Sequence, residues 1–185
     1  MKLLLLSVLT LVLVSFIPPE KPNTLPLDPY IGCCGAESVQ FRLDNSLIFI
    51  PNMFTPNGDA INDLFKPFFK TDKIALESFV VRSKVENTLI WQLNVEDLAK
   101  PYWGWFGDVS KDSIYTGGFK YSMTFKVKNT GQTQTINGVA CSAWCKGTGK
   151  ITISNNNQCF FPMQYAKDSV YSQSPIYLEI DCLKP

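Results

Sequence analysis

The chain has 185 residues, of which 45% are hydrophobic and 18% charged, and its formal net charge is +1. Its 13 Phe, 7 Tyr and 4 Trp can fill a core, which excludes a disordered polymer. The low net charge excludes electrostatic nucleic-acid binding, and the lack of histidine excludes Ser-His-Asp or Cys-His catalysis and His-ligated metals. We therefore expect a protein that is not an enzyme, with no nucleic-acid partner and no small-molecule substrate.

The first residues have the pattern of a secretory signal peptide. Lys2 precedes an apolar run from Leu3 to Ile17, which ends at Pro18. A membrane-spanning helix needs roughly 20 apolar residues, so the shorter run predicts a signal peptide over residues 1–18, with an uncleaved anchor as the alternative. We expect an exported protein in the periplasm, at the outer membrane or cell surface, or released from the cell.

Prolines and cysteines follow the leader. Five prolines within residues 18–32 predict an extended arm over residues 19–38. An even number of cysteines in an exported chain predicts disulfides, and the six are Cys33, Cys34, Cys141, Cys145, Cys159 and Cys182. A bond between the adjacent Cys33 and Cys34 would be strained, so we expect each to bind a cysteine in the C-terminal third and to tie the arm to the domain. A thiolate metal site that uses Cys141, Cys145, Cys159 and Cys182 is the alternative.

From Val39 onward the hydrophobic pattern alternates with a period of two. The clearest case is 119–127, where apolar side chains share one face and Lys120, Ser122, Thr124 and Lys126 share the other. Other strands are predicted at 39–43, 47–50, 79–81, 89–93, 133–136, 151–154, 159–161 and 176–180. Turns are predicted at Asn57–Asp59, Gly117–Gly118, Asn129–Gly131, Asn137–Gly138 and 155–157, and one helical turn at Asn94–Ala99, capped by Asn94. The fold class is all-β, an immunoglobulin-like β-sandwich over residues 39–185 with a disulfide-tied N-terminal arm.

One polar loop is held between apolar residues. Asn57, Gly58, Asp59, Asn62 and Asp63 lie between Phe54 and Phe65. One interpretation is an Asx-rich turn, in which side-chain oxygens accept backbone N–H groups and Gly58 takes a positive φ. The other is a calcium site with Asn57, Asp59 and Asp63 as ligands, because calcium binds six to eight oxygens. We expect no cofactor, with calcium at this loop as the possible exception.

The string FTPNGDAIND in this loop resembles the opening of the gliding motility-associated C-terminal domain family, also described as the type B sorting domain of the Bacteroidota type IX secretion system. That opening is close to F-T-P-N-G-D-G-x-N-D-x-F. The chain departs from it at Ala60, where the family usually has glycine. The resemblance covers about residues 48–128, which leaves an extra C-terminal segment at 129–185. It implies a recognition loop made of Phe54, Thr55, Pro56, Asn57, Gly58, Asp59, Asn62, Asp63 and Phe65.

Three functional hypotheses follow. The first is an exported, non-enzymatic envelope or surface protein with a domain similar to this sorting and gliding-associated family. The second is an accessory docking subunit of an outer-membrane assembly, and both imply a protein partner in the outer membrane or the secretion machinery. The third is a carbohydrate-binding module that uses Trp103 and Trp105. Tyr102, Trp103, Trp105 and Phe106 form the densest aromatic cluster, and we expect it to be buried at one end of the sandwich.

Overall fold

The computed structural model describes residues 39–43, 46–100, 102–145, 153–154, 161–162 and 183–184. Within these residues the chain is mostly β-strand, in several sheets, with a single short helix. The all-β class is therefore confirmed. The predicted signal peptide, the arm at 19–38 and most of the segment after Cys145 lie outside the described residues.

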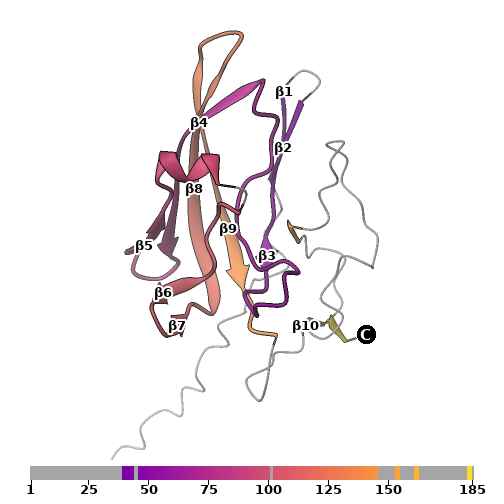
Figure 1. Ribbon diagram of the computed structural model, residues 1–185, viewed down its shortest axis with the longest axis vertical. Coiled ribbons are helices and arrows are strands. Elements are labelled where there is room, and N and C mark those ends of the chain that lie inside the picture. The colour runs from indigo at the N-terminus through magenta and orange to yellow at the C-terminus, as the bar shows by residue number, and fades with distance from the viewer. Residues whose placement is uncertain are drawn as a thin grey trace, which may run out of the picture.

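The largest unit is a five-stranded sheet of order β3-β9-β8-β4-β5 (Figure 1). Neighbouring strands are antiparallel, except that the short β3 runs parallel to the end of β9. The strands are β3 Met53–Phe54, β4 Ile74–Ser83, β5 Leu89–Gln92, β8 Gly117–Val127 and β9 Thr133–Ser142.

Three smaller pairs accompany this sheet. The β1–β2 hairpin, indigo in Figure 1, is antiparallel, and so is the short β6–β7 pair, whereas β10 and β11 are parallel. Their bounds are β1 Val39–Leu43, β2 Ser46–Ile50, β6 Asp108–Ser110, β7 Ser113–Ile114, β10 Ile153–Ser154 and β11 Leu183–Lys184.

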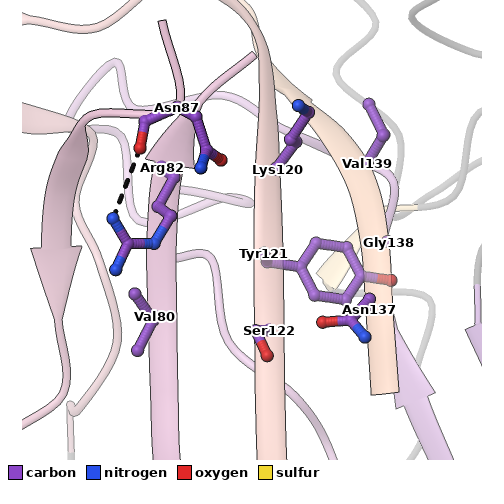
Figure 2. A pocket seen from close by; sticks show the side chains of 9 residues that line it. All are labelled: Val80, Arg82, Asn87, Lys120, Tyr121, Ser122, Asn137, Gly138 and Val139. Atoms are coloured by element: carbon purple, nitrogen blue, oxygen red, sulfur yellow. Dashed lines mark hydrogen bonds between the residues drawn. The ribbon is translucent and has the colours of Figure 1, made fainter. Parts of the chain in front are cut away.

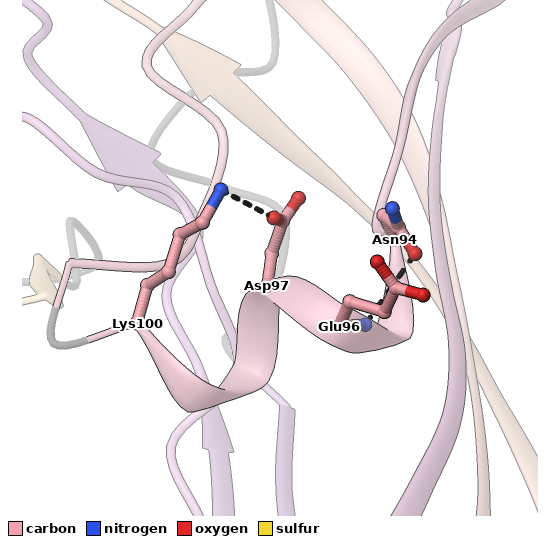
Figure 3. Close-up of polar contacts among 4 residues, drawn as sticks. All are labelled: Asn94, Glu96, Asp97 and Lys100. Carbon is pink, nitrogen blue, oxygen red and sulfur yellow. Dashed lines mark hydrogen bonds and ion pairs between the residues drawn. The ribbon is translucent and has the colours of Figure 1, made fainter.

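The predicted helical turn is present as the 3-10 helix η1, Val95–Ala99, and its cap is the predicted one (Figure 3). The Asn94 side chain accepts a hydrogen bond from the backbone N–H of Glu96 at 3.4 Å. Lys100, which follows the helix, forms an ion pair of 2.6 Å with Asp97. The hydrogen bond to Asp97 and the charge of that carboxylate raise the pKa of Lys100. The local signals at Asn94 were therefore enough to place this element.

The alternation along β8 is confirmed. Phe119, Met123 and Phe125 are fully buried, whereas Lys120 and Lys126 are exposed on the opposite face. Each buried aromatic ring contributes about 1.5–3 kcal/mol relative to an exposed one. Phe54 of the edge strand β3 joins this core, and side chains from outside the sheet complete it: Ile48 and Ile50 of β2, Phe65 and Trp105. The core therefore lies on one face of the large sheet, and the other face stays accessible on β8.

The predicted turn at Asn137–Gly138 is wrong, because β9 runs straight through it to Ser142. Gly138 pairs with Tyr121 of β8, and the tyrosine ring lies against the glycine. A Cβ atom on Gly138 would be 2.2 Å from the Tyr121 hydroxyl oxygen. The glycine therefore makes room for a neighbouring aromatic ring and does not mark a turn. Gly117 and Gly118, also predicted as a turn, are the first residues of β8.

Candidate functional site

The candidate site is the segment from Phe54 to Phe65, called the motif loop below. Its two end residues are fully buried, with ring centroids 5.7 Å apart. Phe65 lies 4.8 Å from the ring of Phe119 on β8, and Phe54 lies 5.4 Å from Trp105. The two phenylalanines therefore anchor the loop in the core.

Backbone hydrogen bonds close the base of the loop. The N–H of Thr55 donates to the carbonyl oxygen of Asn62 at 2.9 Å. Phe65 and Trp105 exchange two backbone hydrogen bonds of 2.9 and 3.0 Å. The loop is thus joined to a segment forty residues later by pairing as well as by ring packing.

The interior of the loop is an Asx-rich turn. The carboxylate of Asp63 accepts the backbone N–H groups of Gly58 and Ala60, both at 2.7 Å. Asp59 accepts the N–H of Ile61 at 2.8 Å and the side-chain amide of Asn57 at 3.0 Å. The Asn57 side-chain oxygen in turn accepts the N–H of Asp59 at 3.0 Å. All four carboxylate oxygens therefore hold the loop in one conformation.

Three residues of the loop have a left-handed backbone. The φ angles are 79° at Gly58, 69° at Ala60 and 54° at Asn62. Glycine and asparagine adopt this region readily, but an alanine there costs about 1–2 kcal/mol because its Cβ approaches the following carbonyl oxygen. The position at which the chain departs from the family's opening is therefore one where the backbone favours glycine.

Replacing Ala60 with glycine is expected to raise the free energy of unfolding by about 1 kcal/mol, since it removes this steric cost. Ala75 in β4 is the matched control, because it lies in an extended strand without a positive φ. Ala75→Gly should lower stability by about 0.5–1 kcal/mol. Urea unfolding of both variants measures the difference, and a destabilised Ala60→Gly variant contradicts the backbone argument.

The three predicted calcium ligands lie together in this loop. Asn57 contacts Asp59, and Asp59 and Asp63 both accept N–H groups of the same turn. Among the described residues, no three His, Cys, Asp or Glu side chains gather around one point. Calcium binding at Asn57, Asp59 and Asp63 stays a prediction, and its test is removal of the metal.

Replacing Asp63 with alanine is expected to lower the free energy of unfolding by about 2 kcal/mol, because two N–H groups lose a charged acceptor that is partly exposed. Asp112→Ala, at an exposed position, should change it by less than about 0.5 kcal/mol. Thermal melts with calcium and with a chelator separate the two interpretations. If calcium is bound, chelator lowers the melting temperature of the wild type but not that of the variant. If the substitution lowers the melting temperature by the same amount with calcium and with chelator, the calcium interpretation is wrong.

Two of the six predicted disulfide cysteines are described. Cys141 and Cys145, at and after the end of β9, are both disulfide-bonded. A bonded sulfur is not a thiolate, so the alternative of a thiolate metal site is wrong for these two. Cys33, Cys34, Cys159 and Cys182 lie outside the described residues, and the tie to the N-terminal arm stays a prediction.

The aromatic cluster divides between core and surface. Trp105 is fully buried, and its indole N–H donates to the backbone oxygen of Asp108 at 3.0 Å. Trp103 is half-buried, with the Lys66 ammonium 5.1 Å from its ring centroid, and burial lowers the pKa of Lys66. Tyr102 and Phe106 are exposed, so burial of the whole cluster is a wrong prediction. Because Trp105 is inaccessible, a sugar platform made of Trp103 and Trp105 is not available.

A groove of about 540 Å³, which the sequence pattern does not predict, lies on the sheet face opposite to the core (Figure 2). Its charged side chains are Arg82 of β4 and Lys120 of β8. The alternation of β8 placed Lys120 on this face. The position of Arg82 beside it depends on the register between two strands, and no local signal gives that register.

Comparison of the chain with models of protein families, with curated proteins and with solved structures finds no match. Among the described residues, no helix is both long and apolar enough to cross a membrane.

Proposed function

We propose that this chain is an exported, non-enzymatic envelope or surface protein whose domain is related to the type IX sorting and gliding-associated family and forms an immunoglobulin-like sandwich. The motif loop is the observation that carries the proposal. Each polar residue that the loop shares with the family's opening has a structural task in it. Asp63 and Asp59 hold the turn, and Gly58 and Asn62 adopt left-handed backbone.

The loop has the form of a rigid recognition element. Its ends, Phe54 and Phe65, are buried in the core, whereas the tip from Gly58 to Ile61 is exposed. A partner that binds this tip meets a surface that is already ordered, so little conformational entropy is lost on binding. A protein of the outer membrane or of the secretion machinery is the partner class that the proposal implies.

The alternative within the same setting is an accessory docking subunit of an outer-membrane assembly. The disulfide-bonded Cys141 and Cys145 support it, because a protein that stays in the envelope gains stability from cross-links. Disulfides also favour an oxidising compartment outside the cytoplasm for either version.

The test is the intact mass of the native protein, measured separately in cytoplasm, periplasm, outer membrane and medium. Loss of the leader in any exported fraction supports export. A species in the medium cut near its C-terminus supports processing as sorted cargo, and a species retained in the envelope and trimmed only at the leader supports the docking subunit. A full-length protein that stays in the cytoplasm with reduced cysteines contradicts the proposal.

A further inference from the structure

Two cationic residues lie directly opposite each other on neighbouring strands, on the sheet face away from the core, and their charged ends point apart (Figure 2). Arg82 of β4 is the direct register partner of Lys120 of β8 (Figure 2). In an antiparallel pair, residues directly opposite project from the same face, and like charges there destabilise the sheet. Both side chains are exposed and both line the groove of about 540 Å³.

The described part of the chain does not neutralise this pair. Its ion pairs join Lys73 to Asp72 and Lys100 to Asp97, and neither involves Arg82 or Lys120. The Arg82 guanidinium donates one hydrogen bond of 3.3 Å, from Nη1 to the backbone oxygen of Asn87. This bond orients the guanidinium and leaves its other N–H groups available, because arginine carries five donors.

The rest of the groove is neutral and polar. Asn87, Asn137 and Ser122 add amide and hydroxyl groups, Val80 and Val139 add small apolar surfaces, and no carboxylate lines it. The site is therefore rich in donors and carries two positive charges. Such a set binds an oxyanion, which accepts several hydrogen bonds at once and offsets the repulsion between the cations.

We propose that the groove of Arg82 and Lys120 binds a phosphate monoester. A phosphate monoester carries about −1.5 to −2 charges at pH 7 and therefore neutralises both cations, whereas a carboxylate neutralises one. Both side chains are exposed and can turn toward one phosphate, which then offers two oxygens to the guanidinium and a third to the ammonium. The phosphate group can belong to a phosphorylated sugar or to a lipid headgroup. This binding site goes beyond the proposed function and does not depend on export or on the motif loop.

The experiment is an amide-detected NMR titration of the folded protein with inorganic phosphate and with glucose 6-phosphate. Arg82→Gln with Lys120→Gln is the test variant. Lys126→Gln is the matched control, because Lys126 lies on the same face of β8 but pairs with Ala75 and Thr133 and does not line the groove. The double variant should weaken glucose 6-phosphate binding by about tenfold or more, and the control by less than about twofold.

Sedimentation with phosphatidylcholine vesicles that contain phosphatidic acid separates the two sources. Soluble ester binding without vesicle binding assigns a phosphorylated small molecule; vesicle binding that the double variant abolishes assigns a lipid headgroup.

Equal losses of binding in the double variant and in Lys126→Gln would mean a diffuse charge effect and overturn the proposal. An acidic peptide that binds more tightly than glucose 6-phosphate, or shifts of amides outside the groove only, would also overturn it. Melting temperatures of all variants show that each remains folded.

Discussion

Replacing Phe65 with alanine is expected to lower the free energy of unfolding by about 3–5 kcal/mol, the range for truncating a fully buried phenylalanine. Phe65 is the hub of the aromatic core. Its ring centroid lies 4.8 Å from that of Phe119, 5.5 Å from Tyr121 and 5.6 Å from Phe79. Truncation therefore opens a cavity lined by side chains of both β4 and β8. Because these strands are held rigidly in the sheet, they can fill the cavity only in part.

Chemical unfolding followed by circular dichroism measures this loss. Phe106→Ala is the control, because Phe106 is 49% exposed and its truncation should cost less than about 1 kcal/mol. The indole signal of Trp105 reports the same site locally, since Phe65 and Trp105 exchange backbone hydrogen bonds. Equal costs for the two variants would show that the motif loop is not anchored in the core. A large loss of unfolding free energy with an unchanged near-ultraviolet circular dichroism spectrum would show that the packing around Trp105 is intact and that the lost stability comes from another part of the core.

Features set by local chemistry were predictable from the sequence. The alternation along β8 named the buried face correctly, and Asn94 capped the expected helical turn. The hairpin between β8 and β9 turns at Asn129–Gly131 as predicted, where Gly131 has a φ of 72°. The Asx-rich interior of the motif loop belongs to the same class, because its hydrogen bonds span at most five residues.

Features set by distant partners were not predictable. Trp105 is buried and Phe106 exposed because Trp105 pairs with Phe65, forty residues earlier. The groove depends on the register that places Arg82 opposite Lys120. Neither pairing can be recognised from the residues next to it in the sequence. The sequence therefore shows that aromatic residues are clustered, but not which of them are buried and which are exposed.

Asn137–Gly138 was also mispredicted because its role depends on a distant partner, Tyr121, and it is the site of the second large predicted loss of stability. Replacing Gly138 with alanine is expected to lower the free energy of unfolding by about 3 kcal/mol, at the upper end of the usual cost of overpacking. The added Cβ would lie 2.2 Å from the Tyr121 hydroxyl oxygen and 2.3 Å from Cζ, so the ring must move. The ring is held by Phe65 and Phe79, with centroids 5.5 and 6.1 Å away.

A double-mutant cycle with Tyr121 separates this clash from a general effect on the strand. Gly138→Ala should cost far less in a Tyr121→Leu background, which removes the ring, but nearly its full cost in Tyr121→Phe, because Cζ remains in place. Gly118→Ala in β8 is the control: its Cβ would lie 3.0 Å from Cδ of Lys84, a flexible side chain that can move aside. Unfolding free energies of the single and double variants give the coupling. A Gly138→Ala cost that is the same in all three backgrounds would mean that the glycine is required by its own backbone and not by the tyrosine ring.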